Sequence, residues 1–197
     1  MLLRPLTDAG VLPAEYPISI QGVSGCSGGG RQLMDAFHGR GEHHLHGAYR
    51  ADGINLNHNH LPEIKKYAKL EVEPMFTSAA GAFAQGMIVQ VPLHLGQLPS
   101  KPTAADLQAV FERHYANQRF VRVLPLESGA AGNTVLDPKT LIGTNVLEIM
   151  IFANAAKSQA LLVARLDNLG KGASGAAAQN VDVMLGLSGN HDDASLD

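Results

Sequence analysis

The chain has 197 residues, of which 45% are hydrophobic and 17% are charged. This length supports one sizeable hydrophobic core, and the low charge density is compatible with a large subunit interface. A net charge of −3, without any run of lysine and arginine, excludes an electrostatic nucleic-acid binder. Cys26 is the only cysteine, so no intrachain disulfide can form, and no stretch approaches the ~20 apolar residues of a membrane helix. We therefore expect a cytoplasmic protein.

In the first half of the chain, apolar segments alternate with polar or glycine-rich loops. Leucines at helical spacing predict a helix at residues 1–10, ended by Gly10. Its start is uncapped, so we expect sequence upstream of it. Strands are predicted at residues 16–23, 48–55, 72–78 and 83–95, and helices at 31–38 and 61–70.

In the second half, Thr103 and Asp106 have the spacing of a capping box, which predicts a helix to about residue 115. Strands are predicted at residues 120–123, 147–152 and 160–166, and helix at 172–187, with a frayed end at 191–197. The strands cluster without regular βαβ alternation. We therefore predict an α+β fold, with a mixed, largely antiparallel sheet and helices packed on one face, in a single domain.

A glycine-rich stretch at residues 24–31 reads Ser-Gly-Cys-Ser-Gly-Gly-Gly-Arg. Such turns expose backbone N–H groups that can hold an anion, and Arg31 could add a bidentate contact. The alternative is a flexible turn, and a P-loop is excluded because the Lys-Ser/Thr ending is absent. Cys26 within it would need a lowered pKa and a neighbouring base to act as a nucleophile, and single cysteines are more often inert.

His58 and His60 precede a predicted helix whose first turn contains Glu63. Histidine titrates near neutral pH and can give and take protons in one cycle, and Glu63 could orient an imidazole. The alternative is helix capping with two surface histidines.

A metal site is conceivable if those histidines combine with His43, His44 and His46. No second cysteine or matching cluster completes a tetrahedral set, and a solvated loop explains the pattern as well. We therefore predict no metal.

The last motif, at residues 167–180, is rich in small side chains. Small residues let a helix approach another backbone or a ligand closely, and Asn168 and Lys171 could reach a bound cofactor. Tight packing of the helix on the sheet is the alternative.

Together, four segments resemble the N-acetyl-γ-glutamyl-phosphate reductases, in that family's order and across nearly the whole chain. They are Val-Ser-Gly-Cys-Ser-Gly-Gly-Gly-Arg at residues 23–31, His-Asn-His-Leu-Pro-Glu-Ile at 58–64, Phe-Val-Arg-Val-Leu-Pro at 120–125 and Leu-Asp-Asn-Leu-Gly-Lys-Gly-Ala at 166–173. Leu-Arg-Pro-Leu at residues 3–6 is similar to the shorter of the family's two subtypes.

The resemblance implies reduction of N-acetylglutamyl phosphate to its semialdehyde with NADPH, in arginine biosynthesis. It implies a domain like the C-terminal domain of glyceraldehyde-3-phosphate dehydrogenase, which carries substrate and subunit contacts in a homodimer or homotetramer, while a Rossmann domain binds NADP. A cysteine thiolate would displace phosphate, hydride would reduce the thioester, and a histidine would manage the protons.

The resemblance also implies site residues. His60 matches the acid/base histidine, with His58 and Glu63 as its supporters. The residues implied to line the substrate pocket are Ser24, Gly25, Ser27, Gly28 and Arg31. Those implied to face the cofactor are Asn168, Lys171 and Gly172, in a helical segment at 166–187 expected to face the NADP-binding domain.

Two parts of the family pattern have no counterpart in this chain. The family's nucleophile lies in a Gly-Cys-Tyr-Pro-Thr motif just before the segment that matches residues 1–8, and Cys26 does not match it. A Rossmann unit opened by a glycine fingerprint is also missing. We therefore expect the chain alone to be inactive and to bind NADPH weakly. The alternatives are a non-catalytic binding or oligomerisation module of the same fold, and a metal-dependent hydrolase, which stoichiometric zinc would reveal.

Overall fold

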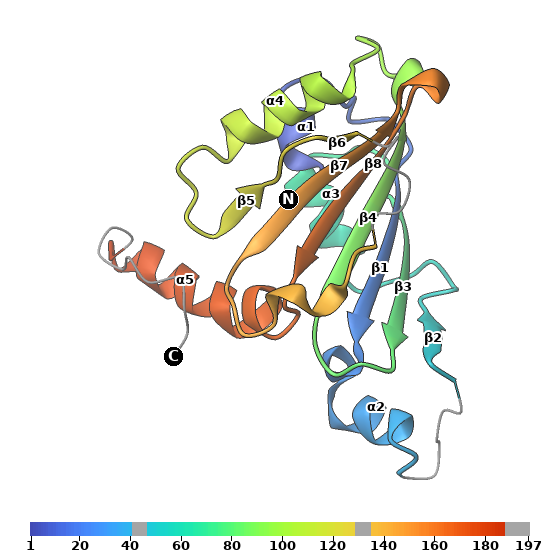
Figure 1. The fold of residues 1–197 in the computed structure, drawn as a ribbon, viewed down its shortest axis with the longest axis vertical. Helices are drawn as coiled ribbons and strands as arrows, with labels where there is room; N and C mark the ends of the chain where they lie inside the picture. The colour runs from blue at the N-terminus through green and yellow to red at the C-terminus, as the bar shows by residue number, and fades with distance from the viewer. Residues whose placement is uncertain (41–46, 129–134, 188–197) are drawn as a thin grey trace.

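The fold is built on one mixed sheet, seen in a computed structural model that describes residues 1–40, 47–128 and 135–187 (Figure 1). The strand order is β2-β3-β1-β4-β8-β7-β5, and β6 also pairs with β7. The strands are β1 (Ser19–Gly25), β2 (Tyr49–Asp52), β3 (Met75–Gly81), β4 (Met87–His94), β5 (Val121–Val123), β6 (Glu127–Ser128), β7 (Leu147–Asn154) and β8 (Gln159–Leu166). The pairs β1–β3, β5–β7 and β6–β7 are parallel, and the other neighbours are antiparallel.

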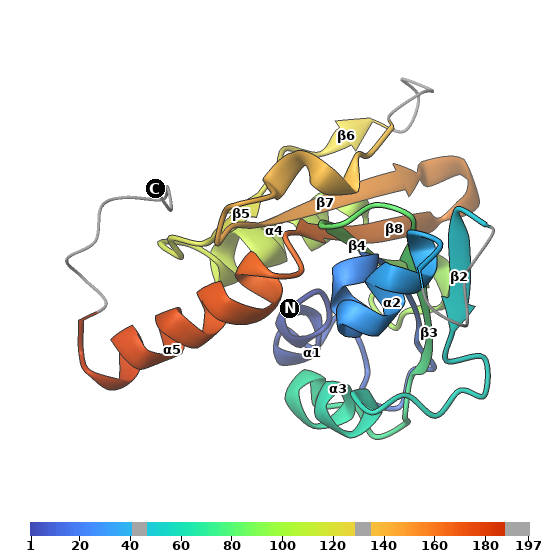
Figure 2. The same cartoon turned by 90° about the horizontal axis from the view of Figure 1, so that it is seen from below.

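Three of the α-helices, α1 (Arg4–Asp8), α3 (Leu61–Ala68) and α4 (Ala104–His114), cover one face of this sheet. The other α-helices of the described residues are α2 (Gly30–Phe37) and α5 (Gly175–Met184). Shorter 3-10 segments are η1 (Cys26–Gly29), η2 (Leu95–Gln97), η4 (Pro138–Leu141) and η5 (Ala155–Lys157), and η6 (Gly170–Ser174) is a π-turn before α5. Figure 2 shows α1 and α3 on the same side of the sheet, while α5 projects away from it.

The hydrophobic core lies between this helix layer and the sheet. Because strand side chains alternate between faces, one set of residues in β4, β7 and β8 points at the helices. Apolar side chains of α1, α3 and α4 pack against that set in one cluster. The predicted mixed sheet with helices on one face is confirmed.

Helix α4 shows how local sequence determines an element. Thr103 Oγ1 accepts a hydrogen bond from Asp106 N at 3.2 Å, and Asp106 Oδ2 accepts one from Thr103 N at 2.7 Å. The predicted capping box is therefore present. One and two turns further on, Leu107 and Phe111 are fully buried against the sheet.

Several predicted boundaries differ from the structure. The strand predicted at residues 83–95 begins only at Met87, because residues 83–86 turn back to pair with the start of η1. The helix predicted from residue 172 begins two residues earlier, as the π-turn η6. The predicted frayed end at 191–197 lies outside the described residues.

Candidate active site

His58, His60 and Glu63 lie together at the start of α3. His60 Nδ1 is 2.9 Å from Glu63 Oε2, and the backbone N–H of His60 donates to His58 Nδ1 at 3.2 Å. The His58 ring packs edge-on against Phe76, with 4.7 Å between centroids. Burial and the neighbouring His60 lower the pKa of His58, while Asp52 partly opposes this shift. His58 is thus held as a neutral acceptor behind the more exposed pair of His60 and Glu63.

This pair borders a cavity of about 450 Å³ on the helix side of the sheet. Apart from His60, Glu63 and Arg4, the cavity is lined mainly by apolar side chains, including Ile20, Phe76, Met87 and Leu166. The arrangement is therefore one acid–base pair beside an apolar surface that could hold an acyl chain.

The glycine-rich loop after β1 is bonded to the turn at residues 83–86. The N–H groups of Gly25, Cys26 and Ser27 donate to the carbonyls of residues 86, 83 and 84, at 2.8, 2.8 and 3.2 Å. Ser27 Oγ also donates to Ala84 O at 2.6 Å. These three N–H groups therefore bond within the protein. The predicted anion site would need them to point at an anion.

The other predicted substrate-loop residues do not form one cluster. A Cβ on Gly28 would lie 3.0 Å from Ser24 Oγ, so these two residues are adjacent. The Arg31 side chain is 95% exposed and lies 3.8 Å from Asp35. Cys26 is buried with Leu33 and Ala80. The structure therefore brings Ser24 and Gly28 together and leaves Arg31 in solvent.

The three predicted cofactor residues also diverge. Asn168 lies beside the glycine loop: its Oδ1 accepts from Gly86 N at 2.8 Å and its Nδ2 donates to Ser27 Oγ at 2.9 Å. Lys171 Nζ instead donates to Gln179 Oε1 at 2.6 Å, and burial lowers its pKa. The Gly172 N–H donates to Asp167 O within the turn. Of the three, only Asn168 contacts the predicted substrate loop.

Gly170, Gly172 and Gly175 have the Gly-x-Gly-x-x-Gly spacing of a dinucleotide-binding turn, between β8 and α5. A Cβ on Gly170 would collide with Thr144 O, and one on Gly175 with Asn145 Oδ1, so close packing accounts for both. β8 is antiparallel to both of its neighbours. The spacing therefore does not open a Rossmann unit here.

Within the described residues, no group of three or more His, Cys, Asp and Glu side chains could hold a metal ion. The candidate ligands His43, His44 and His46 lie outside the described residues. None of the helices in the described ranges has the length and hydrophobicity needed to cross a bilayer.

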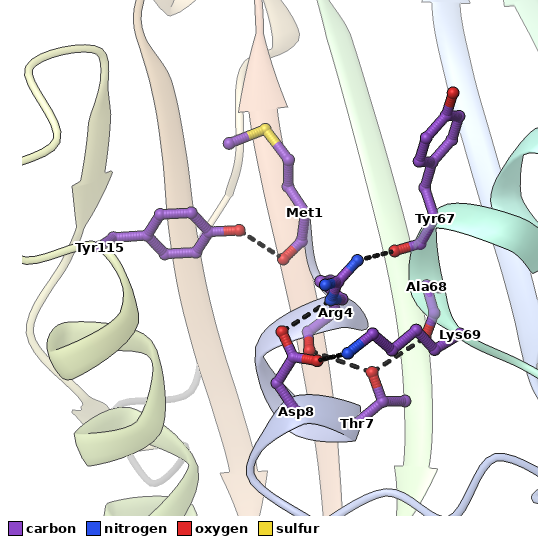
Figure 3. A network of polar contacts seen from close by, with 8 residues as sticks. All are labelled: Met1, Arg4, Thr7, Asp8, Tyr67, Ala68, Lys69 and Tyr115. Carbon is purple, nitrogen blue, oxygen red and sulfur yellow. Dashed lines mark hydrogen bonds and ion pairs between the residues drawn. The ribbon is translucent and has the colours of Figure 1, made fainter.

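A polar network fixes α1 to the C-terminal end of α3 (Figure 3). Arg4 Nη1 donates to Tyr67 O at 3.1 Å, and Thr7 Oγ1 donates to Ala68 O at 2.9 Å. Both carbonyls belong to the last turn of α3, where intrahelical partners are missing. Asp8 accepts from Arg4 Nε at 2.6 Å and from Lys69 Nζ at 2.7 Å. The network thus holds the helix whose other end carries His60.

Asp8→Asn is expected to destabilise the fold at pH 7, and the difference is expected to shrink as the pH falls below about 4, where an ordinary aspartate begins to protonate. Lys69 and then Arg4 lower the pKa of Asp8, so its contribution is present above the unfolded pKa and is lost as the pH falls through the folded pKa. Urea unfolding of both forms between pH 7 and pH 3 measures this difference. The control is Glu15→Gln, an exposed carboxylate outside the network; an equal loss there would contradict the account.

A family model described as the dimerisation domain of semialdehyde dehydrogenases matches residues 1–168. The chain belongs to that family. The matched region ends at Asn168. It comprises the sheet and α1 to α4, together with His58 and His60, and α5 lies beyond it.

Two bacterial relatives cover nearly the whole of this chain. It is 49% identical over 187 residues to N-acetyl-gamma-glutamyl-phosphate reductase of Burkholderia cenocepacia, covering 95% of the chain and 59% of that protein. It is 48% identical over 191 residues to N-acetyl-gamma-glutamyl-phosphate reductase 2 of Pseudomonas putida, covering 94% and 58%. The resemblance predicted from four motifs is confirmed, and the chain spans less than two thirds of these relatives.

Solved structures agree on the fold. Aspartate semialdehyde dehydrogenase II from Vibrio cholerae superposes with a TM-score of 0.66 at 13% identity, over 93% of this chain and 58% of that one. The Francisella tularensis aspartate semialdehyde dehydrogenase gives 0.65 at 11% identity, over 93% and 60%. At this identity the likeness shows the shared fold of the dimerisation domain and nothing further.

Gly86→Ala is expected to lower the free energy of unfolding by about 3 kcal/mol or more. Gly86 has φ +106°, and a Cβ there would collide with the backbone carbonyl of Pro138, which no side-chain rotation can relieve. The matched control is Gly143→Ala, where φ is +79° and nothing lies within 4 Å of the added Cβ, so only about 1 kcal/mol is expected. Urea unfolding of both variants measures the difference, and equal losses would contradict the role of packing at Gly86.

Proposed function

We propose that this chain is the substrate-binding and subunit-contact part of an NADPH-dependent N-acetyl-γ-glutamyl-phosphate reductase, which forms N-acetylglutamate semialdehyde. The observation that carries the proposal is 48 to 49% identity to reductases of that name along 94 to 95% of the chain. The mainly apolar cavity beside His60 and Glu63 supports it by offering a place for the acyl chain. A non-catalytic module of the same fold is not favoured, because the relatives are named as enzymes.

The proposed chemistry assigns proton transfer to His60. If Glu63 accepts the Nδ1 proton of His60, Nε2 is left to donate to or accept from the reacting group. His58, through the His60 backbone N–H, fixes the turn that presents this imidazole. The pair can then protonate the oxygen that develops negative charge during acyl transfer and take the proton back afterwards.

NADPH would supply the hydride when bound, but the described residues do not form a site that fits it. Asn168 uses both ends of its amide within the chain, and Lys171 is held by Gln179. We therefore propose that the cofactor is bound mainly by the part of the longer relatives that this chain does not span.

We also propose that this chain alone is inactive. Acyl transfer by the family's route needs an accessible thiolate. Cys26 is 2% exposed and packs behind Leu33 and Ala80, so it is not placed to attack a substrate.

Two surfaces fit the remaining parts of such an enzyme. Helix α5 projects from the sheet with Val181, Val183, Met184 and Leu185 all exposed, and we propose that it packs on the NADP-binding domain (Figures 1 and 2).

The sheet face opposite the helices has a hollow of about 360 Å³ lined by strands β4, β7 and β8. We propose that a second copy docks there in a homodimer, which sedimentation of the protein would confirm and a monomer would contradict.

Growth of an arginine auxotroph that lacks its own reductase tests the activity. The extended enzyme for this test carries the upstream part of the Burkholderia cenocepacia reductase fused before Met1. The extended enzyme is expected to restore growth without arginine, whereas this chain alone and the extended enzyme with His60→Asn are not. Failure of a folded extended enzyme to restore growth would overturn the proposed function.

A further inference from the structure

One buried amide joins two motifs that lie 141 residues apart in the chain. Asn168 is 9% exposed, and both ends of its side chain are bonded. Its Oδ1 accepts from Gly86 N at 2.8 Å, and its Nδ2 donates to Ser27 Oγ at 2.9 Å. The amide therefore holds the turn at residues 83–86 with one end and the glycine loop with the other.

The direction of these hydrogen bonds requires an amide. Ser27 Oγ gives its single proton to Ala84 O at 2.6 Å, so towards Asn168 it can only accept. Gly86 N can only donate. A side chain at position 168 must therefore accept at one atom and donate at the other, which a neutral carboxamide does and a carboxylate does not.

The same contacts connect the loop to the cavity wall. Gly86 O accepts from Gly25 N at 2.8 Å, and the next residue, Met87, lines the cavity that His60 borders. Leu166, two residues before Asn168, lines it too. A Cβ on Gly28 would lie 3.7 Å from Asn168 Nδ2, so the amide also packs against the middle of the loop.

We propose that Asn168 is a positioning residue that joins the glycine loop to Gly86 and so fixes the cavity wall at the neighbouring Met87, and that it is not a cofactor contact. The inference rests on the proposed function. An amide that is buried with both ends bonded gains little from exchanging those bonds for a ligand, whereas losing it leaves the Gly86 N–H unpaired.

The kinetic test uses Asn168→Ala, Ser27→Ala and the double variant in the extended enzyme. Each single substitution removes two hydrogen bonds, including the one that Asn168 and Ser27 share, and is expected to lower kcat/KM for N-acetylglutamate semialdehyde by about tenfold or more. The double variant is expected to lose clearly less than the product of the two single losses, because both substitutions break the shared bond between Asn168 and Ser27. The KM for NADP⁺ should change by less than about twofold in every variant.

Asn145→Ala is the matched control, because Asn145 is another buried amide and donates to Gly175 O at 3.2 Å. It should destabilise the fold. In the double variant with Ser27→Ala, the loss in kcat/KM should equal the product of the two single losses. The conservative Asn168→Asp should recover towards the unsubstituted kcat/KM as the pH falls, since a protonated carboxyl can donate to Ser27.

Hydrogen exchange at the backbone N–H groups of Gly86 and Ser27, in this 197-residue chain, tests the positioning role of Asn168 separately from the proposed function. Faster exchange in Asn168→Ala together with the kinetic pattern supports it. A tenfold rise in the KM for NADP⁺ with unchanged exchange would overturn it, as would faster exchange without a change in kcat/KM. An inactive unsubstituted extended enzyme would count against the proposed function, while unchanged exchange in Asn168→Ala would still reject the positioning role.

Discussion

Replacing His60 by asparagine in the extended enzyme is expected to lower kcat about 10²- to 10⁴-fold, the usual contribution of a positioned acid–base group. The imidazole Nδ1 lies 2.9 Å from Glu63 Oε2, and His60 is the histidine among the residues that line this cavity. Asparagine retains hydrogen-bonding capacity but cannot transfer a proton. The measurement is kcat in the phosphate-dependent direction, followed as NADPH formation.

The matched control for this prediction is His114→Asn. His114 ends α4 and packs edge-on against Tyr115, with 4.8 Å between ring centroids, away from the His60 and Glu63 pair. Its replacement should leave kcat within about twofold. A His60→Asn enzyme that kept kcat within the same range would remove His60 from the proposed chemistry.

Arg165→Met is expected to lower the free energy of unfolding by about 3 to 5 kcal/mol, the usual effect of breaking a buried ion pair. Arg165 Nη2 lies 2.6 Å from Glu148 Oε2, and the two side chains are 13% and 11% exposed. Arg165 also donates to Thr140 Oγ1 at 3.0 Å and so ties η4 to the sheet. Without the guanidinium, Glu148 would remain as a nearly buried charge without a counter-ion.

The double variant Arg165→Met with Glu148→Leu tests the cause of that loss. Replacing both partners by apolar side chains removes the uncompensated charge, so most of the stability should return. Urea unfolding of the single and double variants measures both values. A single variant that lost less than about 1 kcal/mol, or a double variant less stable than the single one, would show that the ion pair does not act in this way.

Local signals in the sequence predicted much of this fold. The Thr103 and Asp106 capping box marks the start of α4 because its two hydrogen bonds form between residues three apart. The spacing of His60 and Glu63 predicted their contact for the same reason. The late hairpin of β7 and β8 follows from two apolar segments separated by a short turn.

Features that depend on distant contacts could not be predicted in this way. Residues 83–86 continue an apolar pattern and were assigned to a strand, but they turn to bond the glycine loop some 60 positions earlier in the chain. Asn168 and Lys171 are close in sequence, yet Asn168 precedes the π-turn and bonds Ser27, whereas Lys171 lies within the turn and bonds Gln179. Glycine is needed at positions 170 and 175 because a Cβ there would collide with Thr144 O and Asn145 Oδ1. No local sequence pattern reveals these contacts.

The most direct test of the proposed function is the phosphate-dependent oxidation of N-acetylglutamate semialdehyde by the extended enzyme, with aspartate semialdehyde as the competing substrate. We predict NADPH formation that requires phosphate and that strongly favours the acetylated substrate, with no formation by this chain alone. Equal rates with both substrates, or none from a folded extended enzyme, would contradict the assignment of this domain to an N-acetyl-γ-glutamyl-phosphate reductase.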